Sequence, residues 1–331
     1  MIQKYMDFLK SDAFLRPLGI PSGTEVIFSV LGQGEYNLNY VFSHPVTGKK
    51  LVLRINTGSQ MHLADQIGYE YGALVHLIPS GRTPKPVCCW PDRKMLVMEY
   101  LSGRALRYEA DMEIGARILA DIHSVPVPAN SGLLQPDHPA FAIYEECQQM
   151  VQHYFDWEEA DQEVSGLLGM LVEEIGRLPL KEPSDGPRCI VNTELNSGNF
   201  LIDGENSHLV DWEKPLLSEP AQDLGHFLAP TTTFWKTDVI LTPKHVKEFV
   251  SRYIAAVDGR IDCTTLAQRL PLYFTVTCLR GVTWCAMAYR EYCQPDRQLR
   301  NDDTFKKLQA YLEPAFLRNI LENYVRKDFL A

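Results

Sequence analysis

The stretch Val191-Asn192-Thr193-Glu194-Leu195-Asn196-Ser197-Gly198-Asn199-Phe200-Leu201-Ile202, followed by Leu209-Val210-Asp211-Trp212-Glu213, decides the interpretation of this chain. Its apolar residues predict two short strands separated by a tight turn. Glu194, Asn199 and Asp211 would then lie at one edge of a pocket. Hard oxygen ligands of this kind suit Mg²⁺ that holds nucleotide phosphates.

The order and spacing of these groups resemble the catalytic and metal-binding loops of the aminoglycoside phosphotransferase and choline kinase-like family, part of the protein-kinase-like superfamily. The family pattern is His-Gly-Asp, four residues, Asn, and then a short strand ending in Asp before an aromatic residue. The resemblance implies that Asn199 and Asp211 hold Mg²⁺. It also implies that Glu194 is the base for an acceptor hydroxyl and that Asn192 braces the loop by hydrogen bonds.

Three alterations fall within one triplet of this pattern, because Asn192-Thr193-Glu194 stands where the family has His-Gly-Asp. One extra methylene at Glu194 moves the carboxylate by about 1 Å or more, and such an error can cost on the order of a hundredfold in rate. Two interpretations stay open: a compensated, active rearrangement, or a pseudokinase that binds nucleotide without efficient transfer. Taken singly, Asn199 and Asp211 would also suit ordinary Asx-turns.

The N-terminal part supplies candidate nucleotide-binding residues. Gly32 and Gly34 lie between two predicted strands, where backbone N–H groups can approach phosphates, although many hairpin turns carry two glycines. By resemblance, Arg54 on a predicted strand contacts phosphates and pairs with Glu70, which projects from the apolar side of a predicted helix. The alternatives are an exposed strand charge and a helix-edge carboxylate that reaches solvent.

Two further elements are assigned by position in the resembled family. The segment Met98–Gly103 matches the hinge between two lobes, so the main chain at Glu99 and Leu101 is expected to contact the nucleotide base. Asp223 matches an Asp-Pro-x-x-Asp-Leu element and is expected to cap a helix and steady the catalytic loop.

The pattern of apolar residues predicts an α+β, protein-kinase-like fold in two lobes. Short apolar runs at 26–30, 39–42, 51–55 and 95–98 indicate one antiparallel sheet, and helical spacing between Ile67 and Ile78 places a helix within it. A short helix is expected over Ile2–Leu15. Beyond Tyr100 the stripes are helical. We therefore expect a nucleotide-binding lobe at 1–100 and a helical catalytic and substrate lobe at 101–331.

Composition narrows the possible partners and compartment. The net charge of −10 argues against a nucleic-acid surface, which needs clustered Lys and Arg. The eight cysteines form no paired C-x-x-C sets in this large chain, which favours reduced thiols. Charged residues interrupt the apolar N-terminus, and no run approaches the roughly 18–20 apolar residues of a membrane span. These features predict a cytoplasmic protein with no membrane segment.

The sequence thus predicts an ATP- and Mg²⁺-dependent phosphotransferase, with GTP as the alternative donor. Its acceptor would be a hydroxyl of an aminoglycoside, amino alcohol or sugar-like molecule, and a cationic small substrate is compatible with the acidic chain. The alternative is a catalytically impaired, nucleotide-binding regulatory protein. Neither the oligomeric state nor the acceptor follows from the fold alone.

Overall fold

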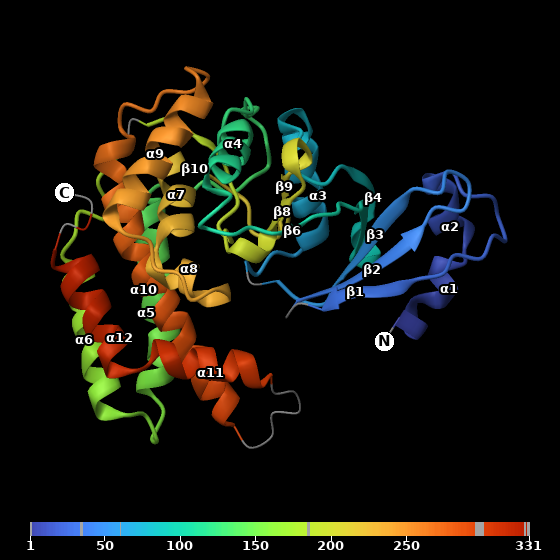
Figure 1. Cartoon of the computed structure of the whole chain (residues 1–331). Helices are drawn as coiled ribbons and strands as arrows, with labels where there is room; N and C mark the ends of the chain where they lie inside the picture. Colours follow the sequence, from blue (N-terminus) through green and yellow to red (C-terminus); the bar gives the residue numbers. More distant parts are fainter. Residues whose placement is uncertain are drawn as a thin grey trace.

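The computed structural model describes residues 2–33, 36–59, 61–183, 186–294, 301–327 and 329. A small lobe built around one sheet joins a larger helical lobe, with the N-terminus on the small lobe and the C-terminus on the large one (Figure 1). The predicted two-lobe α+β fold is therefore confirmed.

The small lobe is a five-stranded antiparallel sheet in the order β1-β2-β3-β5-β4. Its strands are β1 (Ser29–Gln33), β2 (Asn37–Ser43), β3 (Lys50–Asn56), β4 (Pro86–Trp90) and β5 (Met95–Glu99). Helices α1 (Met6–Leu9) and α2 (Asp12–Leu15) precede the sheet, and α3 (Gln66–Leu77) connects β3 to β4.

Alternation along β3 places its side chains on two faces. Leu53 and Ile55 join the core that includes residues of α1 and α2. Val52 joins the core shared with α3 and the large lobe, and Arg54 points to this same face because it is two residues further on. The central strand β3 therefore places one buried cation, Arg54, at the junction of the lobes.

The small lobe differs from expectation in three places. The helix expected over Ile2–Leu15 is split into a 3₁₀ turn, α1 and α2, because Ser11 is extended and acts as the N-cap residue of α2. The first strand begins at Ser29 rather than at Val26 and continues through Gly32. Strand β4 was not predicted, since Pro86-Val87-Cys88-Cys89-Trp90 lacks clear alternation of apolar and polar residues.

The large lobe is built around α10 (Leu266–Cys293), a helix of 28 residues that packs against α5 and α7. Gly225 of α7 permits a close crossing, because a Cβ there would lie 2.8 Å from backbone atoms of α10. The helices of this lobe are α4 (Met112–His123), α5 (Pro139–Phe155), α6 (Gln162–Gly176), α7 (Pro220–Leu228), α8 (Pro230–Lys236), α9 (Pro243–Val257), α10, α11 (Asp302–Tyr311) and α12 (Pro314–Ile320).

Short strands carry the polar motif between the lobes. β8 (Phe200–Ile202) lies between β6 (Arg104–Ala105) and β9 (His208–Leu209), whereas β7 (Cys189–Val191) pairs with β10 (Leu216–Ser218). The expected pair of short strands joined by a tight turn is present as β8 and β9, which pair antiparallel around the turn at Gly204–Asn206. An irregular loop and a 3₁₀ turn separate β7 from β8, so the two strands join different sheets.

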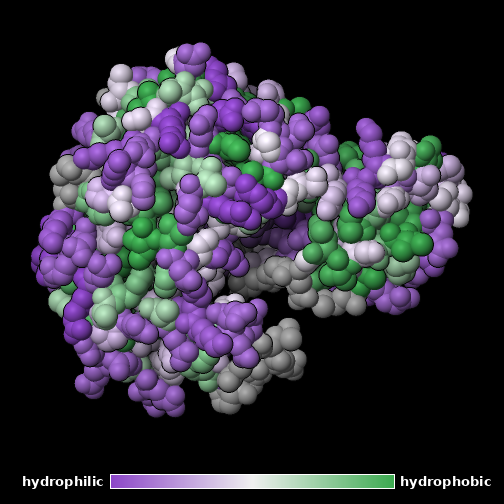
Figure 2. Space-filling view, viewed as in Figure 1, coloured by the Kyte–Doolittle hydropathy of each residue, from purple (hydrophilic) through white to green (hydrophobic). Residues whose placement is uncertain are grey.

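The surface of the molecule differs between its lobes. In Figure 2 the visible face of the small lobe carries a broad hydrophobic area. Ile27 and Val30 are among the exposed apolar residues of this lobe. The visible surface where the lobes meet is hollowed and mainly hydrophilic. None of the helices in the described part of the chain combines the length and apolar character needed to cross a bilayer.

Candidate functional site

Arg54 links the two lobes through a set of carboxylates. Its Nη1 lies 2.6 Å from Glu70 Oε1 on α3, and its Nη2 lies 3.4 Å from Asp211 Oδ1 in the large lobe. Asn39 on β2 accepts a further hydrogen bond from its Nε. The expected Arg54–Glu70 pair is present, and both side chains are buried rather than exposed at an edge.

The region around Arg54 carries more negative than positive charge. Burial alone would lower the pKa of Arg54, but Glu70 and Asp211 raise it, so the guanidinium stays charged. Glu213 lies close by, where burial and then the Asp211 carboxylate raise its pKa to about 7. The Glu70 Oε2 atom is buried with no hydrogen-bond partner. A cation bound here would reduce the repulsion among the carboxylates of Glu70, Asp211 and Glu213.

Asn199 precedes β8 and Asp211 follows β9, so the two residues flank this strand pair. The Val210 N–H donates to the Asn199 carbonyl at 2.9 Å, which brings the two residues to one end of the β8–β9 pair. The Asn199 side-chain NH₂ donates to the Glu194 carbonyl at 2.6 Å, which leaves its amide oxygen as the acceptor for a ligand. Asp211 has φ of 66°, an uncommon value for a residue other than glycine, and 35% of its side chain is exposed.

Asn199 and Asp211 suit Mg²⁺ that also binds phosphate and water better than they suit a metal bound only by protein side chains. Across the described ranges, no three His, Cys, Asp or Glu side chains converge on a possible metal position. Mg²⁺ takes one or two carboxylates, keeps several waters and binds phosphate oxygens. Asn199 and Asp211 offer that partial set of hard oxygens, beside a cluster with excess negative charge.

The altered triplet is held by a dense set of hydrogen bonds. Asn192 donates from Nδ2 to the Asp211 carbonyl at 2.9 Å and accepts the Glu194 N–H at 2.9 Å. Asp223 accepts the backbone N–H groups of Asn192 and Thr193 at 2.8 and 3.0 Å. Asn192 thus braces the loop, and so does Asp223. The expected capping role of Asp223 is wrong, because it lies inside α7 and Glu219 is the N-cap residue.

Glu194 lies in a cluster of charges from the large lobe. Its Oε1 is 3.3 Å from Lys214 Nζ and 3.1 Å from Arg280 Nη2. Glu146 Oε2 on α5 accepts a hydrogen bond from Arg280 Nε at 3.1 Å. Although burial would raise it, the two cations lower the pKa of Glu194 to about 2. Glu194 is therefore ionised and can accept a hydrogen bond at neutral pH.

His226 of α7 contacts the loop that carries Glu194. Its Nδ1 accepts the Leu195 N–H at 3.2 Å, and its Nε2 lies 3.4 Å from Arg280 Nη1. Burial, followed by the charge of Arg280, lowers the pKa of His226 to about 4. The imidazole is therefore neutral and acts as an acceptor.

The expected phosphate loop and hinge lie on the small lobe. Gly32 is in β1 opposite Asn39, at a shift of register, whereas Gly34 lies outside the described residues. The Glu99 N–H donates to the Lys85 carbonyl at 2.9 Å, so this N–H is occupied within the protein. Leu101 follows the end of β5, where the chain passes into the large lobe.

Sequence reasoning missed the charged residues that surround Glu194. Lys214 follows Asp211 by three positions, so the motif itself could have drawn attention to it. Arg280 is the sole charge between Val276 and Ala288, and an isolated charge in an apolar helical segment is a signal of a buried partner. Glu146 and His226 carry no comparable signal, because each is an ordinary polar residue of a helix.

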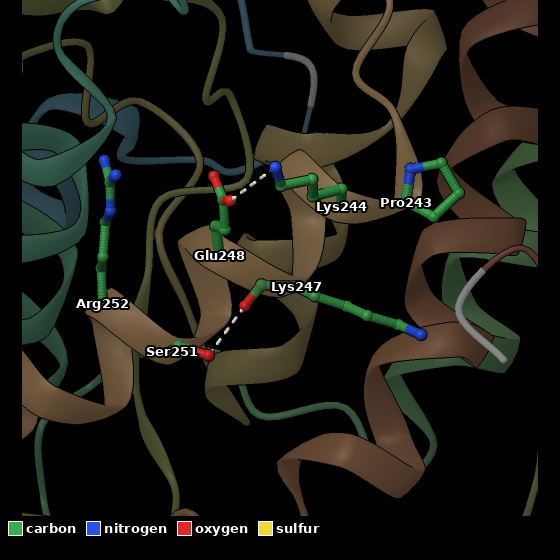
Figure 3. A pocket seen from close by; sticks show the side chains of 6 residues that line it. All are labelled: Pro243, Lys244, Lys247, Glu248, Ser251 and Arg252. Carbon is green, nitrogen blue, oxygen red and sulfur yellow. Dashed lines mark hydrogen bonds and ion pairs between the residues drawn. The ribbon is translucent and has the colours of Figure 1, made fainter.

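A hollow elsewhere on the surface is unrelated to this cluster. Figure 3 shows the side chains that line it, which are Pro243, Lys244, Lys247, Glu248, Ser251 and Arg252 of α9. Lys244 pairs with Glu248 at 3.8 Å, and the Ser251 hydroxyl donates to the Lys247 carbonyl. All six residues come from one helix, and none belongs to the predicted site.

Comparisons with known proteins were informative for sequence family and for fold. The phosphotransferase enzyme family matches residues 27–258, more than two thirds of the chain. A search of curated proteins gave no match. Similar solved structures include a choline kinase from Cryptosporidium parvum Iowa II, with a TM-score of 0.67, 10% identity and coverage of 97% of this chain and 96% of that one.

Two further structures have the same fold at low identity. The choline kinase LicA from Streptococcus pneumoniae has a TM-score of 0.61 and 16% identity, covering 95% of this chain and 99% of that one. The amicoumacin kinase hAmiN, in complex with AMP-PNP, Ca²⁺ and Ami, has a TM-score of 0.59 and 16% identity, covering 97% and 96%. At such identities the likeness establishes the fold alone.

Proposed function

The chain belongs to the phosphotransferase enzyme family, and we propose that it transfers the γ-phosphoryl group of ATP to a hydroxyl of a small molecule. The observation that carries this proposal is the set of contacts from Arg54 to Glu70 and Asp211 across the two lobes. A phosphate-binding cation, its carboxylate partner and a metal-binding carboxylate are the parts that phosphoryl transfer requires.

Each part has a defined task in the proposed reaction. Bound Mg²⁺, held by Asn199 and Asp211, would supply neutralisation of charge on the phosphates. Arg54, fixed by Glu70, contacts phosphate oxygens. We assign residues 1–100 to nucleotide binding, with the Gly32 to Gly34 segment near phosphates. Residues 101–331 form the catalytic and substrate lobe, and the main chain at Glu99 and Leu101, where the lobes join, lies near the base.

Glu194 acts on the acceptor. Its carboxylate accepts a hydrogen bond from the acceptor hydroxyl and orients that oxygen toward the γ-phosphorus. The new bond joins the acceptor oxygen to phosphorus, the bond to the β–γ bridging oxygen breaks, and ADP leaves. The hydroxyl proton passes to Glu194 or to a phosphate oxygen. Because such transfer depends mainly on position and charge, a weakly basic carboxylate suffices.

The comparisons suggest which acceptors to test. Choline, ethanolamine, macrolides and amicoumacin are the molecules that appear in the names of similar structures. We therefore propose a hydroxyl on an amino alcohol, an aminoglycoside or a sugar-bearing molecule, with ATP as the donor and GTP as the alternative.

The test is acceptor-dependent release of ADP or GDP with Mg²⁺, measured for the wild type and for Asp211→Asn. The proposal expects release by the wild type with at least one acceptor and a loss of a hundredfold or more in Asp211→Asn. Undiminished release by Asp211→Asn would remove Asp211 from the metal site.

A second candidate is a nucleotide-binding protein without efficient transfer. The observation that favours it is the pairing of Glu194 with two cations, which occupies one oxygen of the proposed base. Stabilisation by Mg²⁺ and AMP-PNP, together with no ADP or GDP release across the acceptors, is the outcome that would support it.

A further inference from the structure

Two departures from the family pattern, Thr193 and Glu194, lie within one connected group of side chains. We propose that Arg280 and Lys214 are positioning residues, which hold the longer Glu194 carboxylate where the acceptor hydroxyl must meet it. This inference rests on the proposed function. In this inference the altered triplet is one part of a compensated active site. Arg280 and Lys214 reach the carboxylate of a glutamate at position 194, whereas the carboxylate of the shorter aspartate would lie further from them.

Arg280 is placed rigidly enough to fix the carboxylate. It rises from the middle of α10, and the neighbouring Gly281 allows that helix to approach α8 closely, since a Cβ there would lie 2.4 Å from the Thr231 side chain. The guanidinium is held at both ends: Nε by Glu146 Oε2 at 3.1 Å and Nη2 by Glu194 Oε1 at 3.1 Å. A guanidinium fixed at two points defines where Glu194 lies.

Lys214 contacts the same oxygen, and Thr193 holds its backbone. The Lys214 Nζ lies 3.3 Å from Glu194 Oε1, while the Thr193 hydroxyl donates to the Lys214 carbonyl at 3.0 Å. Thr193 has φ of 69°, a conformation that favours glycine. A glycine would adopt this backbone more easily but would lose the hydroxyl that anchors Lys214.

The geometry leaves one side of the carboxylate for the acceptor. Both cations approach Oε1, so we assign Oε2 of the partly exposed Glu194 to the acceptor hydroxyl. Two carboxylates, Glu146 and Glu194, balance two cations, which keeps Glu194 ionised without excess local charge. An aspartate would draw the carboxylate back by about 1.5 Å, the length of one carbon–carbon bond.

The deciding experiment restores the family residue. The wild type, Glu194→Asp, Arg280→Gln and the double variant are compared by ADP release from Mg²⁺ and ATP. The acceptors are choline, ethanolamine, an aminoglycoside and a macrolide, with water as the fallback acceptor. We expect Glu194→Asp to lower kcat by tenfold to a hundredfold while the KM for ATP changes less than twofold. The double variant should be no slower than Arg280→Gln, because the paired residues act as a unit.

A matched variant separates positioning from loss of stability. Glu219 forms a buried ion pair with Arg269, so Glu219→Asp shortens a paired carboxylate outside this cluster. It should lower the urea midpoint but lower kcat far less than Glu194→Asp does. If Arg280→Gln does not fold, Lys214→Gln takes its place in the double variant.

The outcomes distinguish this inference from the proposed function. A Glu194→Asp enzyme as fast as the wild type, or single effects that multiply in the double variant, would overturn the positioning role while leaving the kinase intact. A wild type that releases no ADP, even to water, would overturn the proposed function itself and the positioning role with it.

Discussion

Arg54 is the residue on which the charge balance between the lobes depends. Its partner Glu70 is 1% exposed, so Arg54→Met would leave a buried carboxylate without its cation. We expect a loss of about 3–5 kcal/mol in the free energy of unfolding, measured in urea. The double variant Arg54→Met with Glu70→Leu should regain most of it, because no unpaired charge remains.

An exposed pair on the same lobe is the control for this experiment. Arg16 and Asp12 lie 2.8 Å apart, with 73% and 47% of their side chains exposed. Arg16→Met should change stability by less than about 1 kcal/mol. Equal losses in Arg16→Met and Arg54→Met would contradict the buried ion pair.

His226 makes the protein sensitive to acid. Its pKa is about 4 in the folded protein, against 6.5 for a free imidazole, because of burial and Arg280. Between pH 6.5 and 4 the unfolded chain binds a proton that the folded protein does not, so stability falls as the pH falls through this window. At about 1.4 kcal/mol for each pKa unit, the loss is on the order of 3 kcal/mol.

The measurement is the urea midpoint at pH 7 and pH 5 for the wild type and His226→Asn, which keeps an acceptor for the Leu195 N–H. The variant should lose part of the pH dependence. His153→Asn, at an exposed position of α5, is the control and should behave as the wild type. A His226→Asn protein with an unchanged pH dependence would argue against a buried neutral imidazole.

At this scale the sequence revealed local motifs but not their distant partners. The pairing of Arg54 with Glu70 followed from a cation on a strand and a carboxylate on the apolar side of a helix. Arg280 contacts Glu194 from 86 residues away, and that contact depends on how α10 crosses α7 and α5. No local pattern specifies such a crossing.

The crossing of α7 and α10 positions the residues that hold the loop around Glu194, because Asp223 and His226 lie on α7 and Arg280 lies on α10. Gly225 meets the α10 backbone, and a Cβ there would lie 2.8 Å from the Phe274 nitrogen. Gly225→Ala should therefore cost about 1–3 kcal/mol, because backbone atoms of two packed helices would have to move apart. It should also reduce turnover, since α7 carries Asp223 and α10 carries Arg280.

The same substitution should have the opposite effect on an open helix surface. Gly166 in α6 is exposed, and a Cβ added there would have no neighbouring atoms within 4 Å. Gly166→Ala should stabilise the protein by about 0.5–1 kcal/mol. Urea midpoints of both variants test this; stabilisation by Gly225→Ala would contradict the close crossing.

Elements with long periodic patterns were predictable, and short elements were not. The apolar stripes of α3, α4, α6 and α10 were sufficient to predict helices at those positions. The pairing of β7 with β10, and of β8 with β6, was missed because each of these strands has only two or three residues. Strands this short carry no alternation from which a partner could be inferred.

The two lobes should respond to nucleotide as a unit. Arg54 comes from the small lobe and Asp211 from the large one, so Mg²⁺ with AMP-PNP should stabilise both. At a ligand concentration a hundredfold above Kd, the expected gain is about 2.7 kcal/mol. Asp211→Asn should lose most of this gain in a thermal-shift titration, while Lys244→Gln on the distant face of α9 should retain it. If Mg²⁺ with AMP-PNP does not stabilise the wild type, the proposed nucleotide binding between the lobes is contradicted.

At the scale of the whole molecule, the sequence was sufficient to predict the two-lobe fold and the family resemblance, since both rest on the order of motif residues along one chain. The acceptor was not predictable. In the proposed function the acceptor would meet Glu194 near α5 and α10, and these segments are widely separated in the sequence.

The most direct measurement is ADP release from Mg²⁺ and ATP by the wild type and Glu194→Gln, side by side, across choline, ethanolamine, aminoglycoside and macrolide acceptors. The account predicts release that depends on an acceptor in the wild type and falls by about a hundredfold or more in Glu194→Gln, with AMP-PNP binding retained in both. Equal release by the two proteins, or no acceptor-dependent release by a wild type that binds AMP-PNP, would contradict it.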